Sequence, residues 1–430
     1  MDIPRQVATT ILGAVIDSHM PLDDAFNAVP DSMQVRDRAF VRQLVTTVLR
    51  RLGHIDGLID ASLKKPLPPA MTVVRNVLRG GIAQLLYMDV PDHAAINTSV
   101  DLLERQKDKR TAGFKGLVNA ILRRITREGP EMLAKLDPSD TTPDWLWNAW
   151  VATHGKDIAQ AINDAHLVEP PLDITLMPDE DKAEWAEKLE ATILPSGSLR
   201  RTGGGRIYDL PGYEEGSWWV QDMAATLPAK LLGDVAGQEI IDMCAAPGGK
   251  TAQLVAAGAT VIAVDRSGPR LKRLRENLKR LNLRADVIEA DGKSWQVKGE
   301  KVDALLLDAP CSTTGTMRRH PDVAWLKSDE DVATMVPLQA AILDNCAKMV
   351  KPGGTLVYCV CSLQPEEGAT QIERFLADNA DFERAPVTAD EPGMSTDFIT
   401  EDGDVQTLPC HLSDQGGIDG FFIARLQKKA

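Results

Sequence analysis

Five short apolar runs, separated by helical stretches, most constrain the fold of the carboxyl-terminal half of the chain. They are rich in valine, isoleucine and leucine, turn residues bound each of them, and they cover residues 239–243, 260–264, 286–289, 302–307 and 355–360. Such runs are typical of strands buried on both faces of a parallel sheet. Their alternation with helices predicts a doubly wound α/β domain over residues 238–430, with a further strand at 420–426. In the strand order 3-2-1-4-5, the fourth and fifth strands are neighbours and ligands bind beyond their carboxyl ends.

The first part of the chain shows helical periodicity instead. Apolar residues recur at i, i+3, i+4 and i+7 across residues 41–52 and 114–125, and helices are also predicted over 73–87 and 94–103. This pattern predicts an all-α domain over residues 1–135. The segment 143–237 mixes a helix pair, an extended stretch and a glycine-rich turn, which predicts a small α+β connecting domain. Three domains agree with a length of 430 residues at roughly 150 residues per domain.

Composition narrows the class of protein. The chain is 43% hydrophobic, and no run approaches the roughly 18 uncharged apolar residues of a membrane span. Because the first residues lead into an amphipathic helix and not a secretory signal, we expect a cytoplasmic protein without a membrane partner. Six cysteines are too few for a disulfide scaffold in a chain of this length, so free thiols are predicted.

The distribution of charge favours a nucleic-acid partner, although the net charge of -14 at first argues against one. Residues 1–140 hold 19 Lys and Arg against 17 Asp and Glu, so the acidic excess lies in the rest of the chain. Residues 105–127 contain eight basic residues and one acid, and residues 266–284 again contain eight and one. A solvated helix face explains either segment alone, but together they predict surfaces that neutralise phosphates. The first segment comprises Arg105, Lys107, Lys109, Arg110, Lys115, Arg123, Arg124 and Arg127.

The first apolar run leads into a tight turn of small residues and then into a helix. Small residues let the backbone approach a ligand closely. The second and third runs end near Asp265 and Asp291, and an acid at Asp265 can accept both hydroxyls of a ribose. The turn lacks the glycine that a P-loop requires at Cys244 and departs from the dinucleotide pattern, so S-adenosylmethionine, which has no phosphate, fits better. The turn comprises Cys244, Ala245, Ala246, Pro247, Gly248, Gly249 and Lys250.

Two cysteines follow the fourth and fifth apolar runs, and we expect Cys311 and Cys361 to face each other across the methyl group of the cofactor. Carbon 5 of cytosine is a poor nucleophile until a thiolate adds to carbon 6. Asp308 precedes this pair at the mouth of the fourth strand, where its carboxyl group can hydrogen-bond ring nitrogen 3 and the exocyclic amine of the base. The two thiols therefore predict methylation of carbon 5 of cytosine.

Cys359 shares a strand face with Cys361, which raises the alternative of a metal or redox site. No cysteine-rich or histidine-rich motif completes a set of ligands, so we expect no metal and interpret Cys359 as a buried packing residue.

Three motifs resemble the signatures of the RNA (cytosine-5) methyltransferases of the Sun/Fmu family: residues 242–250, 308–316 and 358–362. In the amino-terminal part, residues 36–40, 81–87 and 115–123 resemble the NusB family of RNA-binding helical domains, over residues 4–127. The sequence departs from the Sun/Fmu pattern at Val360, where the family usually has threonine, and at 173–176, which leaves RNA contacts of the connecting domain undefined.

The resemblance implies a role for each matching residue. S-adenosylmethionine lies on the turn 244–250, with Asp265 at its ribose and Asp291 by its adenine. Arg270 lies beside the cofactor. Asp308 lies near the methyl donor and the target base. Cys361 is the nucleophile, and Cys311 assists release of the product.

The resemblance implies methylation of carbon 5 of a specific cytosine in small-subunit (16S) ribosomal RNA, through a covalent adduct at carbon 6, and we expect the protein to act as a monomer. The same chemistry on tRNA remains an alternative. A non-catalytic RNA-binding assembly factor is a second, and the intact thiols argue against it.

Overall fold

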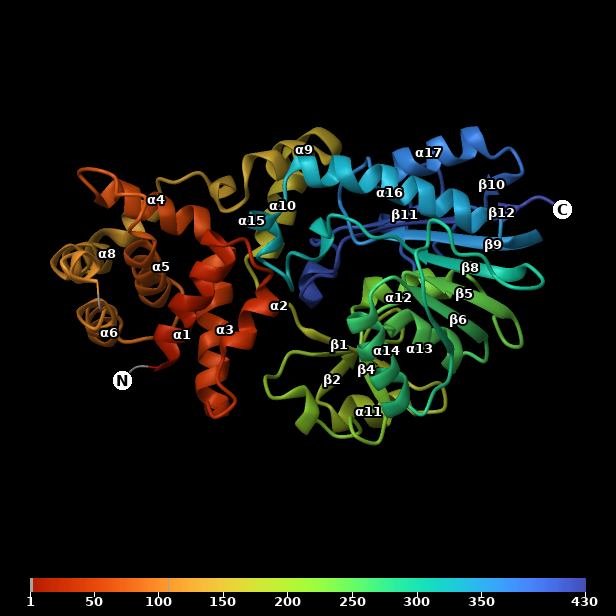
Figure 1. The fold of residues 1–430 in the computed structure, drawn as a ribbon, viewed down its shortest axis with the longest axis horizontal. Coiled ribbons are helices and arrows are strands. Elements are labelled where there is room, and N and C mark those ends of the chain that lie inside the picture. The colour runs from red at the N-terminus through yellow and green to blue at the C-terminus, as the bar shows by residue number, and fades with distance from the viewer. Residues whose placement is uncertain (1–2, 107) are drawn as a thin grey trace. The chain divides into compact units, whose positions relative to one another are not determined.

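The computed structural model describes residues 3–106 and 108–430, which divide into two compact units (Figure 1). The first unit comprises Met1–Leu167 together with Arg319–Ser328, and the second comprises Val168–Arg318 and Asp329–Ala430. Lys107, one of the predicted basic residues, lies outside the described residues. The segment predicted to connect two domains, 143–237, contributes to both units.

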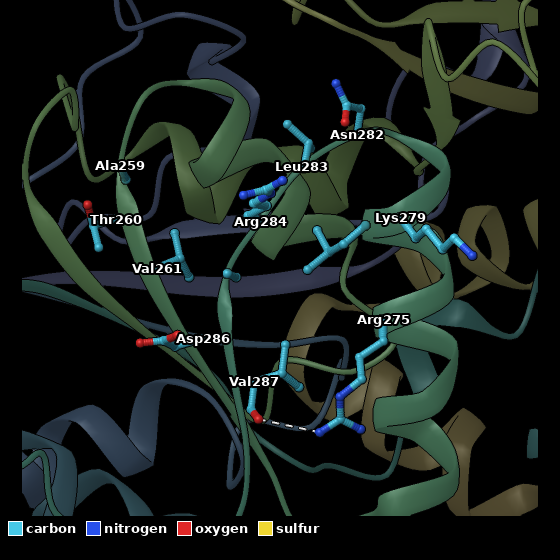
Figure 2. A pocket seen from close by; sticks show the side chains of 12 residues that line it. Ala259, Thr260, Val261, Arg275, Lys279, Asn282, Leu283, Arg284, Asp286 and Val287 are labelled. Carbon is cyan, nitrogen blue, oxygen red and sulfur yellow. Dashed lines mark hydrogen bonds between the residues drawn. The ribbon is translucent and has the colours of Figure 1, made fainter.

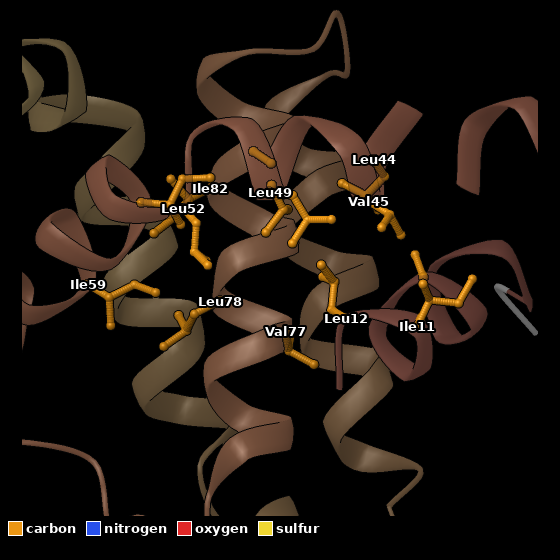
Figure 3. Packing of buried hydrophobic residues seen from close by; sticks show 14 of the residues in the cluster. Ile11, Leu12, Leu44, Val45, Leu49, Leu52, Ile59, Val77, Leu78 and Ile82 are labelled. Carbon is orange, nitrogen blue, oxygen red and sulfur yellow. The ribbon is translucent and has the colours of Figure 1, made fainter. Parts of the chain in front are cut away.

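The first unit is all helical, as predicted. Its core is made by apolar faces that recur at helical spacing, and Figure 3 shows side chains of α1, α3, α4 and α5 pointing toward one another. Ile11, Leu49, Ile59 and Leu78 are fully buried there. The helices are α1 (Ile3–Leu12), α2 (Leu22–Ala25), α3 (Val35–Arg50), α4 (Leu52–Ser62), α5 (Thr72–Leu86), α6 (Asp92–Glu104), α7 (Lys109–Ala112), α8 (Lys115–Leu133), α9 (Asp144–His154), α10 (Lys156–His166) and α15 (Val323–Leu326).

The segment Arg319–Ser328 folds with this helical unit although it follows the Cys311 motif in sequence. The indole nitrogen of Trp325 donates a hydrogen bond to the carbonyl oxygen of Leu49 at 2.9 Å. The carboxylate of Asp322 accepts one from the backbone nitrogen of Leu22 at 2.9 Å. Trp325 and Leu326 also pack against the helical core. Residues far apart in the chain thus complete one hydrophobic core.

The second unit begins with a four-stranded antiparallel sheet in the order β2-β3-β1-β4. Asp173 and Arg200 form a fully buried ion pair of 2.7 Å across β1 and β3. The strands are β1 (Leu172–Leu176), β2 (Ala191–Ile193), β3 (Leu199–Arg201) and β4 (Trp218–Val220), with α11 (Lys182–Lys188) between the first two.

A larger mixed sheet forms the rest of this unit, in the order β10-β12-β9-β8-β5-β6-β7, with β11 paired to β12. The five predicted strands, numbered 1 to 5 along the chain, are β5, β6, β7, β8 and β9. In space they lie in the order β7-β6-β5-β8-β9, which confirms the predicted order 3-2-1-4-5. The final predicted strand, β12, pairs antiparallel with β9. The strands are β5 (Glu239–Met243), β6 (Thr260–Asp265), β7 (Asp286–Glu289), β8 (Val302–Asp308), β9 (Val350–Val360), β10 (Phe382–Arg384), β11 (Val405–Thr407) and β12 (Phe421–Lys428).

Helices cover both faces of this sheet, as Figure 1 shows. Alternate residues of each strand enter two separate cores, because successive side chains point to opposite faces. Ile240, Leu306 and Val357 pack in the core with α12 and α13, whereas Ile241 and Leu305 pack in the core with α16 and α17. The helices are α12 (Met223–Lys230), α13 (Gly249–Ala256), α14 (Gly268–Arg280), α16 (Asp329–Ala347) and α17 (Ala369–Asp378).

Candidate active site

The two predicted catalytic cysteines meet at the carboxyl ends of β8 and β9. These strands pair in parallel, with Asp308 opposite Cys359, so the segments that follow them leave the sheet at the same edge. The sulfur atoms of Cys311 and Cys361 lie 3.5 Å apart, within hydrogen-bond distance for two thiols. Both side chains are half-buried, and all six cysteines of the chain are free.

A cavity of about 330 Å³ opens at this edge of the sheet. Seven residues predicted from the sequence line it: Cys244, Asp265, Arg270, Asp291, Asp308, Cys311 and Cys361. The carboxyl ends of five strands therefore bring their predicted residues to one place, as expected for an open α/β sheet. The remaining lining residues are Met243, Val264, Arg266, Ala290, Gly292, Ala309, Pro310, Thr313, Leu338 and Ile342.

The other predicted cofactor residues, Ala245 to Lys250, shape the turn behind the cavity. Gly248 has a φ of 102°, and a Cβ atom there would lie 2.8 Å from Cγ of Leu274. Only glycine therefore fits this position without strain. The backbone nitrogen of Ala246 donates to the Asp265 carboxylate at 3.2 Å, and Arg270 donates to the carbonyl oxygen of Ala246. These bonds fix the turn to the end of β6.

Asp265 is held in place from several directions. Its carboxylate also accepts from the backbone nitrogen of Ser267 at 2.9 Å and lies 3.5 Å from the Arg270 guanidinium. The side chain is only 2% exposed. A buried carboxylate that is oriented in this way at a strand end is suited to accept hydrogen bonds from sugar hydroxyls. The donors and the turn thus fit a nucleoside cofactor, without a phosphate-binding loop.

Asp308 is anchored on both carboxylate oxygens. Nζ of Lys250 lies 2.8 Å from Oδ2, and the Cys359 thiol donates to Oδ1 at 3.5 Å. Burial lowers the pKa of Lys250, but the Asp308 carboxylate outweighs that effect and the net pKa is raised. Burial, followed by the charge of Asp308, raises the pKa of Cys359 well above its usual value. Lys250 is therefore an ammonium ion and Cys359 a neutral thiol, and both orient Asp308.

These contacts go beyond the sequence prediction for Cys359, which is buried as expected but also donates a hydrogen bond. Its side chain has no exposure to solvent. Within residues 3–106 and 108–430, no group of three or more His, Cys, Asp or Glu side chains could hold a metal ion.

The Cys311 thiol differs from an ordinary surface cysteine. Its hydrogen bond with Cys361 is the largest influence that raises its pKa, burial is the second, and the pKa lies well above the usual value. Cys311 therefore remains protonated at neutral pH and can donate to the sulfur of Cys361.

Sequence reasoning missed two apolar residues of α16, Leu338 and Ile342, which line the cavity. Both residues belong to a regular helical pattern. No local feature of the sequence distinguishes an apolar residue that lines the cavity from one that packs in the core. A second cavity, of about 700 Å³, lies between the end of α14 and the first residues of β6 and β7 (Figure 2). None of the predicted site residues lines it.

Comparison with known proteins identifies two families along the chain. The family described as 16S rRNA methyltransferase RsmB/F matches residues 229–427, and the NusB family matches residues 2–127. Ribosomal RNA small subunit methyltransferase B of Cronobacter sakazakii is 34% identical over 99% of this chain and 98% of its own length. The chain belongs to the RsmB/F family of rRNA methyltransferases.

Solved structures show the same fold. The protein titled PH0851 covers 99% of this chain and is itself covered to 99%, with a TM-score of 0.78 and 22% identity. NSun6 from Pyrococcus horikoshii matches 67% of this chain with a TM-score of 0.57 and 20% identity. As an RsmB/F family member, the chain is an S-adenosylmethionine-dependent rRNA methyltransferase. In its described part, no helix is long and apolar enough to cross a membrane.

Proposed function

We propose that this RsmB/F family member methylates carbon 5 of a cytosine in 16S rRNA through a covalent bond between Cys361 and carbon 6. The observation that carries the proposal is the pair of thiols 3.5 Å apart in the wall of one cavity. One thiol suffices for addition to the ring. A second thiol within reach of the first is needed only when the bond to the enzyme must later break.

The cofactor would lie in the cavity of about 330 Å³, with Asp265 at its ribose and Asp291 near its adenine. The turn from Cys244 to Lys250 forms the wall behind it. Arg270, which holds Asp265 and Ala246, keeps this wall in place. When bound, S-adenosylmethionine supplies an electrophilic methyl group. Because ligand pockets of this kind have volumes of about 300 Å³ and above, the cavity is large enough for such a ligand.

The chain supplies the nucleophile and orients the base. The Cys361 sulfur, as thiolate, forms a bond to carbon 6 and thereby makes carbon 5 nucleophilic. Asp308, held by Lys250 and Cys359, accepts a hydrogen bond from the exocyclic amine of the cytosine. After methylation, the proton on carbon 5 leaves to water or a basic side chain and the sulfur–carbon bond breaks. Cys311 donates a hydrogen bond to the departing Cys361 sulfur.

The target cytosine must leave its stack to reach a cavity of this depth. Two exposed basic surfaces support RNA as the partner: the segment 105–127, apart from Lys107, and the outer side of α14. Lys272, Arg275 and Lys279 are all exposed on α14, and their spacing places them on one side of the helix. Phosphate contacts of this kind orient RNA without selecting a sequence.

The proposal is tested by identifying the product. Purified protein, methyl-labelled S-adenosylmethionine and 16S rRNA should yield 5-methylcytidine at one position, as measured by nucleoside mass spectrometry and bisulfite sequencing. Cells without the protein should lack the same mark. A product methylated on the exocyclic amine would contradict the proposal, and a mark found only in tRNA would correct the substrate.

A further inference from the structure

A buried carboxylate lies directly behind the two catalytic thiols. Glu367 follows β9 by seven residues, and its side chain has no exposure to solvent. Four neutral groups donate to it: the backbone nitrogen of Ser312 at 2.8 Å, the Ser312 hydroxyl at 2.5 Å, the Ser362 hydroxyl at 2.5 Å and the Gln339 amide at 2.9 Å. We call Glu367, Ser312, Ser362 and Gln339 the carboxylate clamp.

The members of the carboxylate clamp are neighbours of the cysteines in sequence. Ser312 follows Cys311, and Ser362 follows Cys361. The Gln339 amide also donates to the carbonyl oxygen of Pro310 at 2.9 Å, so the residues on both sides of Cys311 are held. One carboxylate therefore connects the segment after β8 with the segment after β9.

Further bonds join the same two segments. The hydroxyls of Ser312 and Ser362 lie 3.2 Å apart, and the backbone nitrogen of Gly315 donates to the carbonyl oxygen of Cys361 at 3.0 Å. Glu367 is itself fixed to β9, because the buried Tyr358 hydroxyl donates to its backbone oxygen at 2.6 Å. The carboxylate thus acts from a rigid position.

A carboxylate in such a place is costly unless every lone pair is used. Hydrogen bonds to an ionised acceptor are roughly twice as strong as those between neutral groups. A fully satisfied polar network of this kind favours a single arrangement of the segments that it joins, because any other arrangement leaves a buried charge without partners. An apolar side chain of equal size would fill the space but would not fix both serines.

We propose that Glu367 is a positioning residue whose carboxylate holds the Cys311 and Cys361 sulfurs at their reacting separation. This inference rests on the proposed function, in which both sulfurs act on one cytosine ring. The reacting atoms, carbons 5 and 6, are bonded to each other, so the thiols must be placed accurately. A misplacement of about 1 Å can cost roughly 10²-fold in rate.

The separation of the thiols is measured without RNA by oxidation with diamide. The two thiols lose two electrons and two protons to diamide and form one disulfide, which peptide mass spectrometry identifies as Cys311–Cys361. In Glu367→Gln, we expect this disulfide to form about 10-fold more slowly than in the wild type. Asp404→Asn is the matched control, because Asp404 is another buried carboxylate of this unit and pairs with Arg384 at 3.2 Å. An unchanged rate in Glu367→Gln would overturn the proposal.

Methylation gives an independent measurement. We expect Glu367→Gln to lower kcat by about 10²-fold while the RNA KM and the cofactor Kd stay within about twofold. Glu367→Asp, which keeps the charge, should recover part of kcat. Ser362→Ala removes one hydroxyl only and should show the same pattern more weakly, which keeps the test valid if Glu367→Gln does not fold. A lower kcat with an unchanged rate of disulfide formation would contradict positioning. If the wild type makes no 5-methylcytidine, the proposed function fails, and the oxidation rates still decide the role of Glu367.

Discussion

Two cavities of the second unit lie at opposite ends of the same sheet, and the larger of these two is not the candidate active site. The cavity of about 330 Å³ lies at the carboxyl ends of the strands, whereas the cavity of about 700 Å³ lies at the amino-terminal ends of β6 and β7. In the larger cavity, Figure 2 shows the basic side chains of Arg275, Lys279 and Arg284 among apolar and small polar ones, and Arg275 donates to the Val287 carbonyl oxygen at 3.4 Å. In the smaller cavity, three thiols and three carboxylates converge.

The volume of a cavity alone therefore does not identify the active site. The smaller cavity contains groups whose pKa values are shifted by burial and by one another, such as Cys311. Groups of this kind cluster at functional sites. The larger cavity lies beside the edge strand β7, which has a neighbour on one side only, and residues at the end of α14 line it. Substitutions at each end of the sheet test which cavity contains the active site.

The largest expected effect is the loss of the nucleophile. Cys361→Ala should lower the rate of methylation by about 10⁴-fold or more, because the proposed function assigns the bond to carbon 6 to the Cys361 sulfur. Methyl transfer to 16S rRNA measures the rate. Cofactor affinity, measured by calorimetry, should stay within about twofold and serves as the control. Appreciable methylation by Cys361→Ala would show that Cys361 in the smaller cavity is not the nucleophile.

The next effect concerns cofactor binding. Asp265→Asn replaces a charged acceptor with a neutral amide and should weaken the binding of S-adenosylmethionine by about 10- to 100-fold. The matched substitution at the other end of the sheet is Asp286→Asn, on the exposed start of β7. It should leave the Kd unchanged. Equal losses in the two variants would show that cofactor affinity does not distinguish the cavities.

A third effect is a dependence of stability on pH. Burial raises the pKa of Asp242, which lies on β5 beneath the smaller cavity, to about 7, and the Thr251 hydroxyl donates to it at 2.5 Å. Because the folded state holds this proton more tightly than the unfolded chain, the stabilisation is complete below pH 4 and is lost as the pH rises through 7.

The free energy of unfolding of the wild type should therefore fall relative to Asp242→Asn between pH 4 and pH 8, by at most about 4 kcal/mol. Urea unfolding at both pH values measures the difference. Asp286→Asn should show none, since exposed substitutions typically change stability by less than about 0.5 kcal/mol. A constant difference between wild type and Asp242→Asn at all pH values would show that the carboxyl group does not titrate in this range.

The smallest effect is expected at the larger cavity. Lys279→Glu should weaken RNA binding by about 3- to 10-fold at low salt and reduce its dependence on salt concentration, without changing cofactor affinity. Lys348→Glu, an equal change of charge at an exposed residue after α16, is the control. If Lys279→Glu instead abolishes cofactor binding, the two cavities are not functionally separate.

Much of this arrangement could be predicted from the sequence, because the alternation of apolar strand segments with helices indicates the order of the strands in the sheet. Once Cys311 and Cys361 follow neighbouring parallel strands, their convergence is a geometric consequence. Asp265 and Asp291 reach the same edge of the sheet for the same reason. The resemblance to the two families was visible in the sequence because each family motif lies within one short segment of the chain.

Other features depend on contacts that no local pattern encodes. Glu367 lies in a turn after β9, and only the folded chain shows that its carboxylate faces Ser312, 55 residues earlier. The pairing of Cys359 and Lys250 with Asp308 is likewise a long-range contact. The segment Arg319–Ser328 joins the helical unit through Trp325, although its sequence position lies within the predicted catalytic domain.

The most direct test of the central claim is a covalent complex between protein and RNA. Cys311→Ala, incubated with 16S rRNA and S-adenosylmethionine, should accumulate an adduct that survives denaturing electrophoresis, because addition by Cys361 proceeds while release is impaired. Mass spectrometry of the digested adduct should locate the bond at Cys361, and Cys361→Ala should form none. An adduct that persists in Cys361→Ala, or an equal absence from both variants in the presence of active wild type, would contradict the account.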